Sequence, residues 1–266
     1  MSAILNEQQL AIYSMPLFSS LEKQGELCMN ELINQTIEIR FTGKINCIET
    51  GKSISKTYGE GLCYEAWLKS PAAAPSVIHP ELSRIHEGIA LRDFEWEMKY
   101  HNCQHVVYLS FTDKVKVGVT RSTNTISRWI DQGALAALIF AETPYRQLAG
   151  QIEVFLKDYV ADKTSWQAMI TCNAADISIL MKEKERLENI ITEDLGLFLS
   201  DDYQVTNIYY PVNTLPKKIL SCKLERTPVL TGKLVGIKGQ YLIFDSGQVI
   251  NIRSHAGYEI ELLCAS

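Results

Sequence analysis

The stretch HVVYLSFTDKVKVGVTR, residues 105–121, decides the fold of the chain. It contains two runs rich in β-branched and aromatic residues, Val106–Phe111 and Val115–Thr120, joined by the short polar segment Thr112-Asp113-Lys114. Residues of this kind favour strands, and so short a connection favours a tight turn. The stretch therefore predicts a β-hairpin.

Further elements follow the hairpin closely along the chain. RWIDQGA, residues 128–134, predicts a short helix, Leu135–Ala141 predicts a third strand, and Gln147–Tyr159 predicts an amphipathic helix. The order strand, strand, helix, strand, helix predicts a compact α+β unit over residues 105–173. In the last helix, Gly150 would allow another backbone to approach closely.

Three polar side chains of this unit are of types that act on phosphodiesters. Tyr108 stands in the first strand, Arg128 on the short helix and Glu153 on the amphipathic helix, where the apolar stripe leaves the glutamate off the buried face. A guanidinium can bind a phosphate through two hydrogen bonds. One carboxylate suffices for Mg²⁺ or Mn²⁺, because water and substrate oxygens complete the shell of such an ion. These residues predict a phosphate site with Glu153 as its candidate metal ligand.

The same positions resemble the core of the GIY-YIG nucleases. Tyr108 stands at the tyrosine of the first motif, Lys116-Val117-Gly118 at the second motif, Arg128 at the helix arginine and Glu153 at the metal-binding glutamate. The resemblance implies a metal-dependent endonuclease whose catalytic residues are Tyr108, Lys116, Arg128 and Glu153. Two positions depart from the pattern of these nucleases. Lys116 stands where the second motif has a tyrosine, and Asp162-Lys163-Thr164 stands where the family has an asparagine near the end of the core.

The chain as a whole is similar to a bacterial and archaeal family of unknown function. The similarity rests on the runs KVGVTR (116–121), RWIDQGA (128–134) and GIKGQY (236–241). It extends from about residue 36 to residue 262 and implies a shared fold.

A structural interpretation of the central residues competes with the catalytic one. Tyr108 would then be a core aromatic, and Glu153 and Lys157, four residues apart, would form a surface ion pair worth less than about 1 kcal/mol. The chain would in that case be a protein-interaction or structural module with no nucleic-acid role. Whether the chain is an enzyme stays open on the sequence alone.

Residues 1–104 predict a helix over Phe18–Asn34, a strand over Thr36–Thr42 and two turns that carry Cys47 and Cys63. The turns resemble the knuckles of a zinc ribbon, but Thr50 and Ala66 stand where each second cysteine would be. Zinc is therefore not expected, since half-sites bind weakly. A site that adds Cys103 and a histidine to the two cysteines is the alternative. The seven cysteines are scattered, and the N-terminus lacks an export signal, which favours reduced thiols and a cytoplasmic location.

The rest of the chain divides into a helical connector and a β-rich segment. Residues 174–203 form the connector, and its charged run Lys182–Arg186 is expected to be a solvated face. Residues 204–266 contain short strands and tight-turn signals at 238–239 and 246–247, which predict a small β-barrel of the SH3 or OB type.

DNA or RNA is the partner that these features favour. The candidate contacts are basic or aromatic residues of the central unit and of the barrel: Arg121, Arg146, Lys233, Lys238, Tyr241 and Arg253. The alternative is that the barrel residues are ordinary aromatics and solubilising charges. The net charge of −5 is only a mild argument against nucleic acid, because residues 176–202 carry eight acidic against three basic side chains. A membrane partner is not expected, because no apolar run reaches the ~18 residues of a spanning helix.

Overall fold

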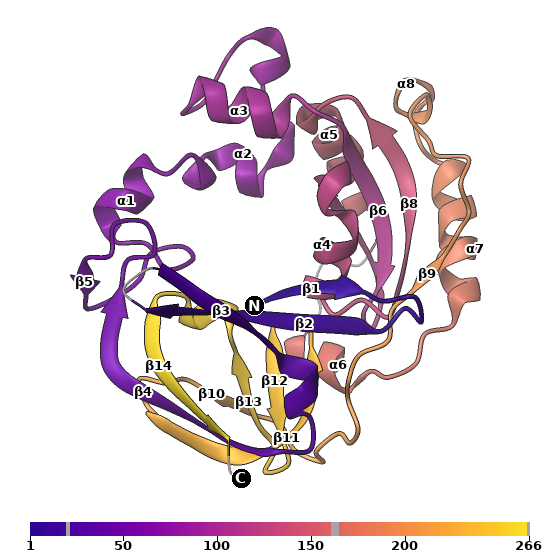
Figure 1. Ribbon diagram of the computed structural model, residues 1–266. Coiled ribbons are helices and arrows are strands. Elements are labelled where there is room, and N and C mark those ends of the chain that lie inside the picture. The colour runs from indigo at the N-terminus through magenta and orange to yellow at the C-terminus, as the bar shows by residue number, and fades with distance from the viewer. Residues whose placement is uncertain (20–21, 161–164, 265–266) are drawn as a thin grey trace. The chain divides into compact units, whose positions relative to one another are not determined.

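The computed structural model describes residues 1–19, 22–160 and 165–264 of an α+β protein (Figure 1). Two compact units divide the chain. One consists of residues 71–208, and the other combines residues 1–70 with residues 209–266.

The unit formed by residues 71–208 is built on a four-stranded antiparallel sheet. Its order is β7-β6-β8-β9, with the bounds Val115–Arg121, His105–Phe111, Ala136–Thr143 and Thr206–Asn207. The helix α4 (Thr125–Asp131) lies between β7 and β8 in sequence, and α5 (Arg146–Lys157) follows β8. The predicted hairpin and the predicted order β-β-α-β-α are confirmed.

Helices cover both sides of this sheet. Figure 1 shows α5 on one side and α7 (Ile177–Glu188) on the other. The core joins Leu109 and Phe140 of the sheet, Ile152 of α5 and Leu180 of α7, all fully buried. The remaining helices are α2 (Pro75–Ile78), α3 (Phe94–His101), α6 (Trp166–Thr171) and α8 (Glu193–Gly196), with 3-10 turns at Pro71–Ala73, Pro80–Leu82, Ile85–Glu87 and Ser122–Asn124.

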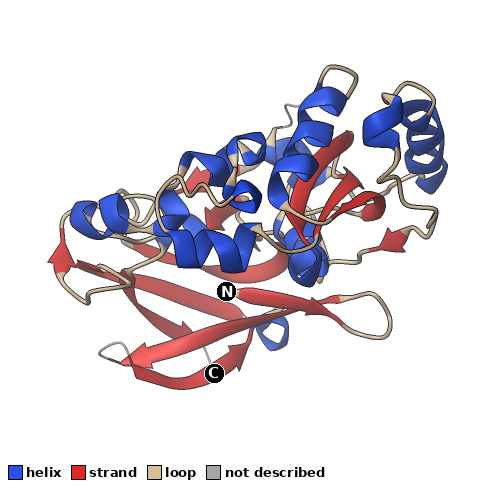
Figure 2. Cartoon of the chain, turned by 90° about the horizontal axis from the view of Figure 1, so that it is seen from above, coloured by secondary structure: helices blue, strands red, loops and turns tan. Residues whose placement is uncertain are grey.

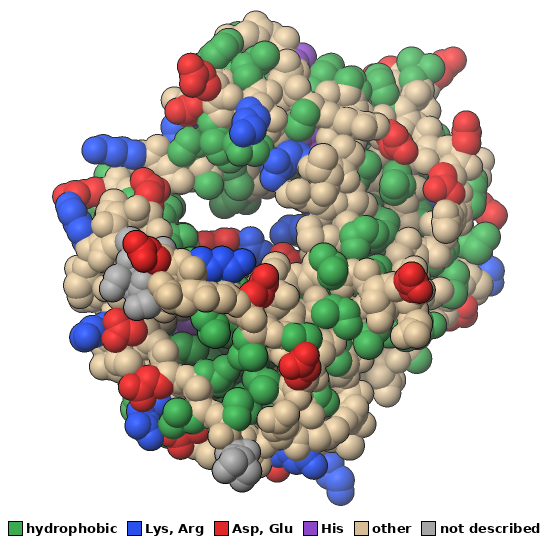
Figure 3. Space-filling model, in the orientation of Figure 1, with side chains coloured by type: hydrophobic (Ala, Val, Ile, Leu, Met, Phe, Trp, Pro, Cys, Tyr) green, Lys and Arg blue, Asp and Glu red, His purple; other side chains and the backbone are tan. Residues whose placement is uncertain are grey.

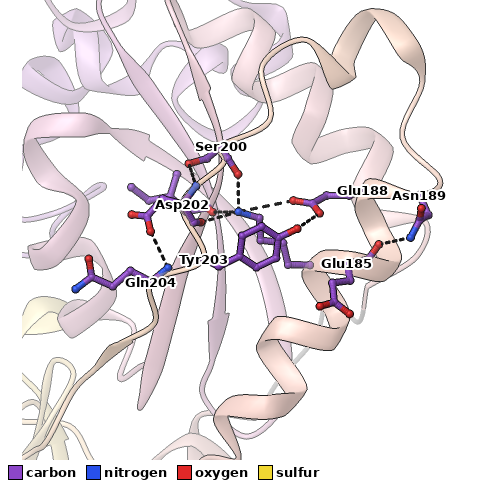
Figure 4. Close-up of polar contacts among 9 residues, drawn as sticks. Glu185, Glu188, Asn189, Ser200, Asp202, Tyr203 and Gln204 are labelled. Carbon is purple, nitrogen blue, oxygen red and sulfur yellow. Dashed lines mark hydrogen bonds and ion pairs between the residues drawn. The ribbon is translucent and has the colours of Figure 1, made fainter.

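One charged side chain of α7 is part of the interior. Lys184 is 0% exposed, so the expectation that the whole charged run is a solvated face is wrong at this position. Its Nζ donates hydrogen bonds to the backbone oxygens of Ser200 (2.6 Å), Asp202 (2.7 Å) and Ile139 (3.3 Å) (Figure 4). The ammonium also lies 4.1 Å from the centre of the Tyr203 ring. The lysine therefore ties α7 to β8 and to the segment that follows α8.

The other unit begins with a three-stranded sheet, not with the predicted helix. Its strands are β1 (Ser2–Leu5), β2 (Ala11–Ser19) and β3 (Glu22–Cys28), and only a 3-10 turn over Met29–Leu32 remains of the helix expected at 18–34. Pairing with β2 supplies hydrogen-bond partners for β3, and Gly25 within β3 disfavours a helix by about 1 kcal/mol relative to alanine.

The larger sheet of this unit combines both ends of the chain. Its order is β10-β13-β12-β11-β4-β14, with the bounds Leu220–Cys222, Gln248–Asn251, Tyr241–Phe244, Val229–Lys238, Thr36–Asn46 and Tyr258–Cys264. The short β5 (Ser53–Ile54) pairs with β4, and the helix α1 (Tyr64–Lys69) follows. The sheet is curled and half-barrel-like, as its labelled strands show in Figure 1, and Figure 2 gives a second view in which all strands of the chain are red. The turns expected at 238–239 and 246–247 are present, with Gly239 at φ +58° and Gly247 at φ +85°.

Candidate functional site

Basic side chains gather at one end of the β7-β6-β8 sheet. His105 at the start of β6 lies opposite Arg121 at the end of β7 and opposite Thr143 at the end of β8. Arg146 begins α5 immediately after β8. The antiparallel topology thus brings two arginines, far apart in sequence, to the same edge.

Tyr108 lies in the middle of β6 and packs tightly against the neighbouring strand β7. It is 1% exposed and lies opposite Gly118, where an added Cβ would be 2.5 Å from the Tyr108 hydroxyl. Only glycine leaves room for the phenol there. The alternation of side chains along a strand places Lys116 on the same face, two residues from Gly118.

A glutamine connects Tyr108 to Arg128. The Gln132 side chain lies 2.8 Å from the Tyr108 hydroxyl, and with its oxygen turned toward Arg128 it accepts from Nε and Nη2 at 3.3 Å. Burial raises the pKa of Tyr108, although the Arg128 guanidinium opposes the shift. The phenol therefore stays protonated, which makes it a poor base for water and leaves its O–H available as a hydrogen-bond donor. The sequence analysis missed Gln132, four residues after Arg128 on the same helical face, a spacing that could have revealed it.

Arg146 is held by backbone oxygens. Its Nε and Nη2 donate to the carbonyls of Ser76 and Val77, both at 2.8 Å. Burial lowers the pKa of Arg146, Glu153 opposes this shift, and the charges of Arg121 and Arg128 add to it, which brings the pKa to about 10. The three arginines, from β7, α4 and α5, are therefore close enough to repel one another.

Glu153 lies inside the unit, so the expectation that it stands off the buried face is wrong. It is 8% exposed, because the segment around Pro80 and Glu81 packs against α5. Gly150 permits this contact: an added Cβ would lie 2.2 Å from the Glu81 nitrogen, which confirms the close approach expected from the sequence. The ion pair with Lys157 is also present, at 3.4 Å.

The surroundings of Glu153 do not fit a resident Mg²⁺ or Mn²⁺. Burial raises the pKa of the carboxyl group, and Lys157 and Arg146 oppose this shift as neighbouring cations. The nearby carboxylate of Glu81 is engaged 3.3 Å from His79 Nδ1. Within the described ranges, no three His, Cys, Asp or Glu side chains are grouped to hold a metal. Lys157 and Arg146 already balance the carboxylates of Glu153 and Glu81, so a dication would add uncompensated positive charge here.

Two histidines behind the arginines stay neutral. Burial lowers the pKa of His101 to about 3 and that of His105 to about 4, and Arg146 and Arg121 add to both shifts. His105 Nδ1 lies 2.7 Å from the Cys103 carbonyl oxygen, and its Nε2 is buried. Neutral imidazoles add no charge of their own, so the positive potential of this edge comes from the arginines.

Arg121 rests on an aromatic ring that the sequence analysis did not select. Its guanidinium carbon lies 4.7 Å from the centre of the Tyr100 ring in α3. Residues 162–164, at the place of the late asparagine, lie outside the residues that the structure describes.

The candidate contacts in the larger sheet do not form one basic face. Lys233 is exposed and lies opposite Thr36, whereas Lys238 is 2% exposed with its Nζ 5.5 Å from the Tyr210 ring. Tyr241, opposite Lys238, is half-buried. Arg253 forms an ion pair with Glu60, with Nε and Nη2 at 2.8 and 2.7 Å from Oε1.

The two knuckle cysteines lie in one small buried cluster with Ala66. The Cys63 sulfur accepts a hydrogen bond from the Ala66 nitrogen at 3.4 Å. Burial raises the pKa of the Cys47 thiol, but donors from Thr50, Cys63 and Glu49 outweigh it and bring the pKa to about 6. Hydrogen-bond donors thus surround the sulfurs of Cys47 and Cys63, although Thr50 and Ala66 stand where the second cysteine of each knuckle would be.

Among the helices that the structure describes, none has the length and apolarity needed to cross a membrane.

Comparisons with known proteins place the chain in a family. No curated protein and no solved structure matches the chain. A family model matches residues 34–260, most of the sequence. The chain belongs to the family described as "Protein of unknown function (DUF2797)".

Proposed function

We propose that the chain binds nucleic acid through phosphate groups at the edge formed by Arg121, Arg128 and Arg146. The observation that carries the proposal is that Arg121 of β7 and Arg128 of α4 both lie close enough to Arg146 of α5 to lower its pKa, while the Glu153 carboxylate opposes them. Like charges at close range destabilise a fold unless an anion neutralises them. A phosphodiester backbone offers such anions in a row.

The arginines would contribute to phosphate binding in different ways. Arg128 is half-buried and oriented by Gln132, and its planar group can donate two parallel hydrogen bonds to one phosphate. Arg146 uses two N–H groups on Ser76 and Val77, so it contributes mainly a fixed charge. Glu153 keeps Lys157 and Arg146 in place as their counter-charge.

The resemblance to the GIY-YIG nucleases supports the ligand class rather than turnover. The order β-β-α-β-α and the positions of Tyr108, Arg128 and Glu153 agree with such a core. The environment of Glu153 does not favour a dication, and the pKa of Tyr108 is raised. We therefore propose a phosphate-binding platform derived from that core, which holds nucleic acid without a resident metal.

Fluorescence anisotropy with labelled oligonucleotides in EDTA, across a salt titration, tests the proposal. We expect salt-sensitive binding that Arg128→Ala weakens by about tenfold or more, because hydrogen bonds to charged groups contribute about 1.5–3 kcal/mol each. The matched control is Lys114→Ala, an exposed lysine at the opposite end of the β6–β7 hairpin, which should change little.

Two results would contradict the proposal. Absence of binding at low salt would refute the nucleic-acid role. Cleavage that requires Mg²⁺ and disappears in Glu153→Gln would show that the glutamate does serve a metal. Product gels run on parallel samples that contain Mg²⁺ in place of EDTA measure this second outcome directly.

A further inference from the structure

We infer that the nucleic acid taken by this site is single-stranded and that one unpaired base stacks on Trp96. This inference rests on the proposed function and names the class of nucleic acid. It starts from α3, whose flank with Trp96 and Tyr100, both half-buried, lies next to the arginine edge.

A continuous row of rings and cations leads from α3 to the arginines. Trp96 and Tyr100, four residues apart, lie on one flank of the helix with ring centres 4.8 Å apart. Arg121 lies 4.7 Å and Lys99 Nζ 5.2 Å from the centre of the Tyr100 ring. Arg121 in turn affects the pKa of Arg146. A phosphate at the arginines and a base on Trp96 would thus belong to neighbouring parts of one strand.

The helix that carries this row is held rigidly. Glu97 is fully buried and accepts from the backbone nitrogens of Leu91 (3.0 Å) and Arg92 (2.7 Å). Asp93 caps the helix by accepting from the Trp96 nitrogen at 2.7 Å. The Trp96 ring also contacts His101 edge-on at 5.0 Å. A preformed platform loses little conformational entropy when a base stacks on it.

The surface around α3 combines the two chemistries that a single strand requires. Basic and apolar side chains lie beside each other over α2 and α3 in Figure 3. Trp96 and Tyr100 are half-buried, so part of each side chain remains accessible. In a duplex the faces of the bases are covered by stacking, whereas in a single strand they are available to aromatic side chains and guanidinium planes. The site therefore favours unpaired bases over a double helix.

The other flank of the same helix provides a matched control. Phe94 is 53% exposed and Met98 is 37% exposed, and both project away from Trp96 and Tyr100 by about 120–160° around the helix axis. Substitution there changes exposed apolar surface without touching the row.

The test compares three ligands by anisotropy: a single strand, the duplex of the same sequence and a single strand in which abasic sites replace the bases. We expect the wild-type protein to bind the ordinary single strand about tenfold more tightly than the abasic strand. Trp96→Leu should remove that difference and leave duplex affinity unchanged, while Trp96→Phe keeps most of it and Phe94→Leu keeps all of it. The comparison of ligands on the wild-type protein does not depend on whether Trp96→Leu folds.

The outcomes separate this inference from the proposed function. Equal affinity for ordinary and abasic strands, or a Trp96→Leu protein that still distinguishes them, would overturn the stacking platform. If Arg128→Ala nevertheless weakens binding to every ligand, the phosphate site stands without the platform. A wild-type protein that binds none of the three ligands would refute both.

Discussion

Replacing Lys184 with methionine is expected to destabilise the unit of residues 71–208 by about 2–4 kcal/mol. The lysine is fully buried, and its Nζ donates to three backbone oxygens, those of Ser200, Asp202 and Ile139. Methionine preserves most of the apolar stem and removes the donors. The three carbonyl oxygens would then lose their charged hydrogen-bond donor. The methionine side chain would occupy the space of the lysine stem and keep water from replacing that donor.

The magnitude follows from opposing contributions. Each hydrogen bond to a charged group contributes about 1.5–3 kcal/mol. Removing the ammonium relieves a desolvation cost of several kcal/mol, while the side-chain entropy changes little, because buried methionine loses about as much rotamer freedom as buried lysine. Burial lowers the pKa of Lys184, and Glu188, 3.7 Å from Nζ, opposes the shift, so the ammonium is itself costly to bury. The remainder, about 3 kcal/mol, agrees with the usual cost of breaking a buried charge network.

Urea-induced unfolding followed by circular dichroism measures the effect. Lys182→Met is the matched control, because Lys182 lies two residues earlier on the same helix and is exposed. We expect the control to stay within about 0.5 kcal/mol of the wild-type free energy of unfolding. If the two methionine variants unfold at the same urea concentration, the structural role given to Lys184 is refuted.

Two further predictions concern the same unit. Gly150→Ala should lower the free energy of unfolding by at least about 2 kcal/mol, because the added Cβ would lie 2.2 Å from the backbone nitrogen of Glu81. Thermal unfolding should show a lower melting temperature for this variant but not for the control Val154→Ala, at an exposed site on α5. An unchanged melting temperature would contradict the packing described for α5. Burial brings the pKa of His105 to about 4, below the ~6.5 of an unfolded chain, so the unfolded state takes up a proton that the folded state does not, and stability falls as pH drops through this window. Urea titrations at several pH values should show a flatter profile for His105→Gln than for His79→Gln, at an exposed site, and identical profiles would count against the neutral buried imidazole.

Local patterns in the sequence were sufficient for the central unit. The hairpin of β6 and β7 follows from neighbouring residues and a short turn, and the close approach at Gly150 follows from the lack of a side chain. Tyr108 and Arg128 could be chosen as candidate site residues, because each lies on the strand or helix that the sequence predicts for it. Each of these predictions depends on residues within one or two elements.

The failures concern contacts between distant segments. Glu153 is buried because the backbone near Pro80 covers α5, a contact that helical periodicity does not encode. Lys184 is buried because three carbonyls from β8 and from the segment after α8 converge on it. The strand pairing of β3 prevails over the helical pattern expected at 18–34. In each case tertiary pairing outweighs local propensity.

The position of β4 has a consequence for the chain as it is synthesised. In the finished sheet Arg40 pairs with Val229 and with Glu261, so the strands on both sides of Arg40 are made much later than β4 itself. At about 5–20 residues per second, the gap between Arg40 and Val229 corresponds to roughly 10–40 seconds of translation. During that time the apolar residues Ile37 and Ile39 have no neighbouring strand of their own sheet, while residues 71–208 form a continuous segment that can fold first. The nascent chain therefore carries an unsatisfied strand that a ribosome-associated chaperone would be placed to shield.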